Sequence, residues 1–232
     1  MSHHHDHKEE HFQGSQAVRD IVIGMADGLT VPFALTAGLS GAIDSNTIII
    51  TAGMAEIVAG SIAMGLGGYL AGTTEYEHYH SERKREYWEV DHLPEKEKEE
   101  IREIMEEYGI SKELSHSVAE DLAKDKDKWV DFMMRFELEL DEPHLHQAKR
   151  SAGNIAGAYI VGGFVPLAGY FITNTPQEGL IYSSIFTVFA LFTFGYVKSK
   201  LTGQKPLKGA LKTTFVGVIA SAAAYGIALW IA

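Results

Sequence analysis

Five long apolar stretches are separated by polar segments along the chain, and each is long enough to cross a bilayer as a helix, which takes about 20 residues. They cover residues 21–43, 47–72, 151–173, 179–197 and 213–232. One such stretch also suits a buried helix of a water-soluble protein, but five in a chain of 232 residues favour a membrane protein. The pattern therefore predicts an all-α membrane protein with five transmembrane helices.

A strongly charged insert separates the second apolar stretch from the third. Residues 75–148 contain 23 of the 31 acidic residues and 11 of the 20 Lys and Arg residues, whereas the rest of the chain has a net charge of +1. We therefore divide the chain into four parts: a His-rich tail that we expect to be disordered, helices 1 and 2, an acidic helical domain, and helices 3 to 5. Their ranges are 1–18, 19–74, 75–148 and 149–232.

The acidic insert has the periodicity and the punctuation of charged, amphipathic helices. Pro94 suits a helix start, Gly109 follows a helix end, Ser111 is a good N-cap, and Pro143 ends the last segment. These signals predict helices over 75–91, 95–108, 112–124 and 126–140. Many of the acidic residues are explained simply by the solvated faces of these helices.

Lys and Arg residues near the span ends predict the orientation in the membrane. They cluster at Arg19, 83–85, 149–150 and 198–212, while the turns at 44–46 and 174–178 contain none. A single topology places all of these basic residues on the cytosolic side, together with the N-terminus and the insert. The C-terminus is then on the opposite side, and the first span acts as an uncleaved anchor because no cleavable signal peptide precedes it.

Composition excludes several kinds of chemistry. The chain contains no cysteine, which rules out disulfides, thiolate metal sites and a cysteine nucleophile. The acidic insert argues against nucleic-acid binding, which needs a basic face. No arrangement of a nucleophile and a base stands out, so we expect a protein that is not an enzyme.

Two acidic residues interrupt the apolar stretches, and an ionisable group inside a span suggests function by default. Asp27 lies in the first stretch, and Glu56 lies near the middle of the second. Met64, two turns after Glu56, should lie at a depth similar to that of Asp27. Carboxylate and thioether ligands together favour a divalent transition metal over magnesium or calcium. Because low dielectric disfavours a charged carboxylate, we expect Glu56 to exchange a proton for a cation.

Two patterns in the insert could bind metal. Glu86 with Glu89, and Glu97 with Glu100, have i,i+3 spacing, and residues three or four apart share a helix face. Together with Met133, Met134 and Glu137 they could form a carboxylate and thioether cluster for several ions. The competing pattern is Glu-x-x-His, the spacing of ferritin-like di-iron sites, and it occurs at Glu75/His78, Glu77/His80 and Glu113/His116.

The N-terminal tail, residues 1–18, is rich in histidine. The tail histidines either capture metal or belong to an expression tag, and they are His3, His4, His5, His7 and His11.

Small residues at i,i+4 spacing let transmembrane helices approach closely, and they are Gly24/Gly28, Gly68/Gly72, Gly153/Gly157 and the row Ala59/Ala63/Gly67. Since five helices are few to enclose a polar path, we expect a homo-oligomer with the path at the subunit interface.

Long motifs identify a family resemblance that covers most of the chain. The first span reads DGLTVPFALTAGLSGA over 27–42, and the second reads EIVAGSIAMGLGGYLA over 56–71, followed by TEY over 74–76. The third contains GGFVPL over 162–167. Together they closely resemble the vacuolar iron transporter family of plants and yeast.

The resemblance implies a homodimer, joined through its transmembrane helices, that exchanges cytosolic ferrous iron for protons across the vacuolar membrane. It implies an ion path at the dimer interface, lined by Asp27, Glu56 and Met64. It also implies metal binding by the insert, through Glu86, Glu89, Glu97, Glu100, Met133, Met134 and Glu137.

Three alternatives stay open beside a proton-coupled iron transporter. Mn²⁺, Co²⁺, Ni²⁺ and Zn²⁺ bind similar ligands, so the chain could be a manganese or broad divalent-metal transporter. The Glu-x-x-His pairs could make it a membrane-tethered di-iron oxidase or iron store. A structural membrane protein with a solvated acidic domain is the third.

Overall fold

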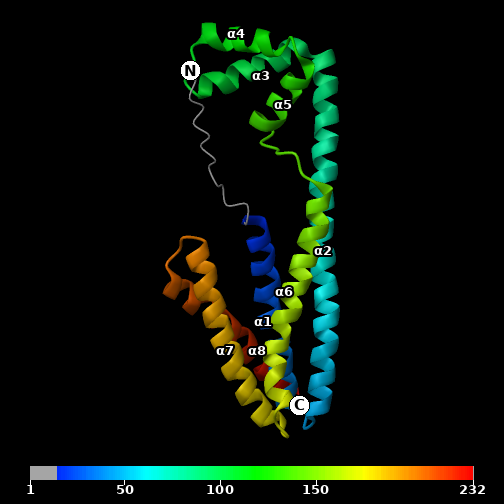
Figure 1. Ribbon diagram of the computed structural model, residues 1–232, viewed down its shortest axis with the longest axis vertical. Helices are drawn as coiled ribbons and strands as arrows, with labels where there is room; N and C mark the ends of the chain where they lie inside the picture. The colour runs from blue at the N-terminus through cyan, green and yellow to red at the C-terminus, as the bar shows by residue number, and fades with distance from the viewer. Residues whose placement is uncertain (1–14, 232) are drawn as a thin grey trace, which may run out of the picture. The chain divides into compact units, whose positions relative to one another are not determined.

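The computed structural model describes residues 15–231, and this part of the chain contains eight α-helices and no strand (Figure 1). In chain order the helices are α1 (Ser15–Ala42), α2 (Asn46–His92), α3 (Pro94–Glu107), α4 (Lys112–Leu122), α5 (Lys126–Phe136), α6 (Leu145–Phe171), α7 (Pro176–Leu201) and α8 (Pro206–Ile231). The histidines at positions 3 to 11 lie outside the described residues, so the expectations for that tail stay predictions.

The five predicted spans are confirmed as five helices that are long and apolar enough to cross a membrane: α1, α2, α6, α7 and α8. Helix α2 has 47 residues, because its apolar first part continues into the charged segment without a proline. Helices α1 and α6 run through Pro32 and Pro166 as continuous helices.

The chain forms two compact units. The first, which we call the membrane unit, contains the described residues up to Tyr69 together with residues from Lys149 onward. The second, the charged unit, is Leu70–Ala148. Helix α2 contributes its first part to the membrane unit and its last part to the charged unit.

Glycine allows close helix packing within the membrane unit. A Cβ atom at Gly24 or Gly28 of α1 would meet backbone atoms of Ile155 or Tyr159 of α6. These two glycines therefore pack α1 on α6, as the small-residue spacing predicts. Gly153 and Gly157 differ, because a Cβ atom at either would meet nothing within 4 Å, and they make no such close contact in the protomer.

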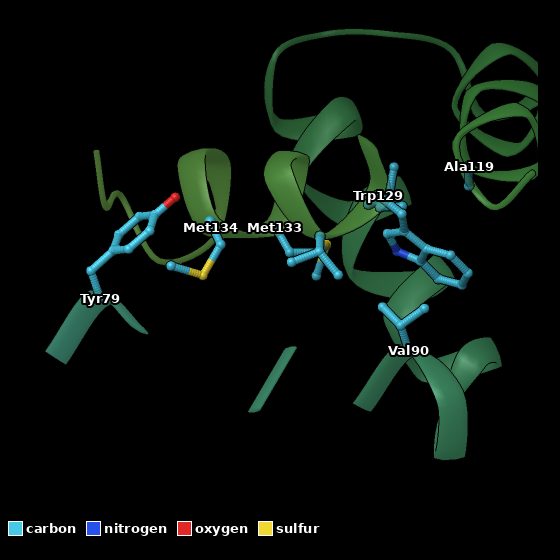
Figure 2. Packing of buried hydrophobic residues seen from close by; sticks show 8 residues of the cluster. Tyr79, Val90, Ala119, Trp129, Met133 and Met134 are labelled. Carbon is cyan, nitrogen blue, oxygen red and sulfur yellow. The ribbon is translucent and has the colours of Figure 1, made fainter. Parts of the chain in front are cut away.

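The charged unit has its own apolar core (Figure 2). In this view Met133 and Met134 project from α5 toward Tyr79 and Val90 on α2, and Trp129 lies beside them. The remaining buried members are Ile101 of α3, Ala119 of α4 and Val130 of α5. Their burial holds four short or partial helices together in a segment that is otherwise strongly charged.

The helix ends of the charged unit follow the predicted punctuation, with two differences. Gly109 has φ 82°, a left-handed conformation that glycine adopts without strain after a helix end. Ser111 is the N-cap residue of α4, but its side chain makes no capping hydrogen bond. Helix α5 ends at Phe136 instead of continuing to residue 140, because Glu139 has φ 53° and cannot extend the helix. Glu137 is therefore the C-cap residue of α5.

Candidate functional site

Three glutamates of the charged unit converge on one point. Glu86 of α2, Glu97 of α3 and Glu137 at the end of α5 each offer a carboxylate oxygen, and these three oxygens lie within 4.8 Å of one another. We call this group the carboxylate cluster. Each member comes from a different helix, so the apolar core that packs the helices also assembles the cluster.

The carboxylate cluster has few neutralising partners. The side chains of Glu86 and Glu97 are 0 % and 1 % exposed, and their four carboxylate oxygens accept no hydrogen bond from any described residue. Arg85 lies at one side, with its Nη2 atom 3.7 Å from Oε1 of Glu86. Unpaired carboxylates are costly to bury, so this arrangement needs protons or a cation.

The pKa values of the cluster reflect this cost. Burial, followed by repulsion from the carboxylates of Glu137, Glu97 and Glu89, raises the pKa of Glu86 to about 8. Burial and the carboxylates of Glu100, Glu89 and Glu137 raise the pKa of Glu97 to about 7. Glu137 is exposed at the rim of the cluster, and its pKa is also raised, first by partial desolvation and then by repulsion from the carboxylates of Glu100 and Glu89. At neutral pH the cluster therefore retains protons that a divalent cation would displace.

The other predicted ligands of the insert lie around this cluster in two different settings. Glu89 and Glu100 are half-buried and act on it electrostatically, but each also faces a basic side chain: Arg85 Nε lies 3.5 Å from Glu89, and Lys96 Nζ lies 2.7 Å from Glu100. Met133 and Met134, by contrast, are buried in the apolar core (Figure 2). Three of the seven predicted ligands are thus brought together as a group.

The Glu-x-x-His pairs are not part of a comparable group. Among the described residues, the group of three acidic or histidine ligands that forms contains no histidine. His78 instead lies 3.8 Å from Glu82, and the ring of His80 packs against Tyr76 and Tyr79.

In the membrane unit, Glu56 is held by a tyrosine from another helix. The hydroxyl of Tyr159 on α6 donates a hydrogen bond to Oε1 of Glu56 on α2. The second carboxylate oxygen, Oε2, is buried and accepts no hydrogen bond from the described residues. One oxygen is thus fixed by a neutral donor, and the other is left for a proton or a cation.

Asp27 and Met64 are half-buried on α1 and α2. Among the described residues Asp27 has neither a hydrogen-bond partner nor an ion-pair partner. No hydrogen bond or ion pair joins Asp27 directly to Glu56 in the described part of the chain. Tyr159 therefore contacts Glu56 directly, and its backbone packs against Gly28, the neighbour of Asp27 in the chain.

Comparisons with known proteins identify the family of this chain. The VIT family model matches residues 18–229. The chain is 51 % identical over 222 residues to vacuolar iron transporter 1 of Arabidopsis thaliana, and the aligned region covers 96 % of this chain and 89 % of that protein. The chain belongs to the VIT family. The predicted family resemblance is therefore confirmed.

The chain is also similar to a second plant protein and to a yeast protein. The vacuolar iron transporter of Centaurea cyanus is 50 % identical, with 96 % of this chain and 91 % of that protein covered. Protein CCC1 of Saccharomyces cerevisiae is 42 % identical, with 92 % of this chain and 69 % of that protein covered.

Two polar residues of this VIT family member were absent from the sequence prediction. Tyr159 is one, and its signal in the sequence was a tyrosine within a run of small and apolar residues. Asp20 is the other: it is 2 % exposed at the start of α1 and accepts hydrogen bonds from Ser151 Oγ at 2.7 Å and Asn154 Nδ2 at 3.4 Å. Its signal was the spacing of seven residues from Asp27, which places both on one helix face.

Proposed function

We propose that this protein is a transporter, not an enzyme, that moves ferrous iron from the cytosol into the vacuole in exchange for protons. One observation carries the proposal: Asp27 and Glu56 are the acidic residues of the apolar stretches, and these stretches contain no Lys or Arg to neutralise them. An uncompensated acid in lipid is expensive and marks ion pathways. Relatives named vacuolar iron transporter suggest the ion and the membrane.

Glu56 is the coupling residue in this proposal. Its Oε2 atom is buried without a hydrogen bond from the described residues. A proton on this oxygen and a divalent cation beside it are mutually exclusive, because both need the same lone pairs. Iron entering from Asp27 and Met64 thus displaces the proton, and reprotonation releases the iron.

The carboxylate cluster collects the metal before transport. Glu86, Glu97 and Glu137 supply oxygen ligands, Glu89 and Glu100 add negative charge, and Met133 and Met134 supply the softer sulfur ligands after a side-chain rotation out of the apolar core. Metal binding releases the protons that the raised pKa values retain, so it becomes stronger as the pH rises. In this proposal the charged unit is cytosolic.

The proposed assembly is a homodimer with the ion path at its interface. Ala59, Ala63 and Gly67 of α2 are exposed in the protomer, and a Cβ atom at Gly67 would meet nothing within 4 Å. Such a row of small residues allows a second helix to approach closely. Met64 lies on the same stretch, so this contact would line the path with a thioether. The N-terminus is cytosolic and the C-terminus luminal in this topology.

The identity of the metal depends on more than the ligands, since Mn²⁺, Co²⁺, Ni²⁺ and Zn²⁺ bind the same donor types. A broad divalent-metal transporter is therefore the second candidate function. The di-iron oxidase has less support, because no histidine joins the carboxylate cluster among the described residues.

Transport into vesicles tests the proposal. Proteoliposomes with an acidic lumen are given Fe²⁺ under anaerobic conditions, and Mn²⁺, Zn²⁺ and Ca²⁺ are compared at the same concentration. We expect Fe²⁺ uptake with alkalinisation of the lumen, little Ca²⁺ uptake, and a loss of at least about 100-fold in rate for Asp27→Ala. Uptake by Asp27→Ala at the parent rate would contradict the proposal.

A further inference from the structure

Tyr159 is unusually placed for a residue whose only task is packing. It is 2 % exposed on α6, and its hydroxyl donates to Oε1 of Glu56. A buried tyrosine needs a hydrogen-bond partner, yet this one uses a transmembrane carboxylate in preference to a backbone carbonyl. Hydrogen bonds to ionised acceptors are roughly twice as strong as neutral ones.

Glycines on two other helices allow Tyr159 to approach closely, one beside its backbone and one beside its side chain. A Cβ atom at Gly28 of α1, next to Asp27, would clash with the backbone of Tyr159. A Cβ atom at Gly60 of α2, one turn after Glu56, would clash with the hydroxyl and ring of Tyr159. The phenol reaches Glu56 by crossing over Gly60, so the contact depends on a residue without a side chain there.

A second buried tyrosine of the same helix gives the contrast. Tyr170 is 1 % exposed, and its hydroxyl is hydrogen-bonded to Ser40 Oγ at 2.8 Å and to the carbonyl oxygen of Thr36 at 3.2 Å. These neutral partners satisfy the phenol and tie α6 to α1. Tyr159 is equally buried but contacts the acid to which the proposed transport assigns the cation.

We infer that Tyr159 is a positioning residue for ion transport: by holding Oε1 of Glu56, it fixes the carboxylate so that Oε2 takes the passing cation. This inference rests on the proposed function. It assigns Tyr159 to the translocation step and not to metal capture. Loss of its hydroxyl therefore lowers turnover and leaves the apparent affinity for iron nearly unchanged.

The test compares Tyr159→Phe with Tyr170→Phe in proteoliposomes, with rates expressed per folded protein measured by size-exclusion chromatography. Both variants remove one buried hydroxyl from α6. We expect Tyr159→Phe to lower the maximal Fe²⁺ uptake rate about tenfold, with KM within about twofold of the parent. We expect Tyr170→Phe to stay within about twofold of the parent in both quantities.

A second pair of variants leaves all polar groups in place. Gly60→Ala should displace the Tyr159 ring from Glu56 and reproduce the loss of turnover. Gly226→Ala, on α8, is the matched control, because a Cβ atom there would meet nothing within 4 Å. This pair answers the question even if Tyr159→Phe does not fold.

The outcomes separate the two proposals. Parent turnover in Tyr159→Phe and Gly60→Ala, with Asp27→Ala inactive, overturns the role of Tyr159 and leaves the transport function intact. Equal losses in Tyr159→Phe and Tyr170→Phe reduce Tyr159 to packing and also overturn the inference. Absence of uptake by the parent protein overturns the proposed function and, with it, this inference.

Discussion

The two units of the chain bury carboxylates in opposite ways. In the membrane unit two buried or half-buried carboxylates accept hydrogen bonds from neutral side chains. Glu56 accepts one from Tyr159, and Asp20 accepts two, from Ser151 and Asn154. In the charged unit Glu86 and Glu97 face other carboxylates, and their oxygens accept no hydrogen bond from the described residues.

The two arrangements suit different tasks. Neutral donors hold a single carboxylate in one orientation without competing for its charge. A group of facing carboxylates repels itself and is stable only with protons or a cation bound. The membrane unit is therefore suited to pass one ion at a time, whereas the charged unit is suited to bind a cation firmly when the pH allows it.

The largest effect in the charged unit should follow from removing a buried ligand. Glu97→Gln retains the shape of the side chain but removes one negative charge from the carboxylate cluster. We expect the affinity of the full-length protein in detergent for Co²⁺ or Zn²⁺ to fall at least about tenfold, by calorimetry at pH 7.5. Glu99→Gln, on the exposed side of α3, is the control. Equal affinities for Glu97→Gln and the parent would refute metal binding at the cluster.

The facing carboxylates also predict a pH dependence of stability without metal. The folded state holds protons on Glu86 and Glu97 up to pH values of about 8 and 7, whereas the ordinary pKa of glutamate is 4.5. The unfolded chain therefore binds fewer protons between pH 4.5 and 8, and the free energy of unfolding falls as the pH rises through this range.

Glu86→Gln isolates this effect. At pH 8.5 and without metal it should raise the free energy of unfolding by about 1–3 kcal/mol, because the buried charge is removed. At pH 5, where the parent carboxyl is already neutral, the change should be small. Thermal melts of the full-length protein carrying Trp230→Phe measure both, because the remaining tryptophans, Trp88 and Trp129, lie in the charged unit. Destabilisation by Glu86→Gln at both pH values would contradict the raised pKa.

The smallest effect concerns the methionines, whose burial in the core sets them apart from the glutamates. Met133→Leu conserves volume and should cost less than about 1.5 kcal/mol of stability. If its sulfur binds metal, as proposed, the affinity for Zn²⁺ should fall by about twofold to tenfold while that for Mn²⁺ stays nearly the same, because Mn²⁺ prefers oxygen. Identical changes for both ions would assign Met133 to packing alone.

The sequence predicted most of the fold, because its signals are local. Five apolar runs give five spans, and Pro94 and Gly109 mark the ends of α3. The end of α5 was placed too late, since the left-handed conformation of Glu139 has no strong sequence signal.

The carboxylate cluster and the contact between Tyr159 and Glu56 were harder to predict from the sequence, because they depend on packing between distant segments. Spacing selected Glu86, Glu97 and Glu137 together with other acidic residues, but only the core of Ile101, Trp129 and the methionines brings those three together. The contact between Tyr159 and Glu56 joins residues 103 positions apart and depends on Gly60. No periodicity within one helix could reveal it.

In the proposed transport a carboxylate inside the apolar helices couples the cation to protons, and Glu56→Gln removes the charge of that carboxylate. Vesicles holding a pH-sensitive dye report proton movement during anaerobic Fe²⁺ uptake by the parent and by Glu56→Gln. We expect iron-driven alkalinisation of the lumen for the parent and a loss of at least about 100-fold in that signal for Glu56→Gln, while metal binding by the charged unit persists. Iron-driven proton flux at the parent rate in Glu56→Gln would contradict this coupling.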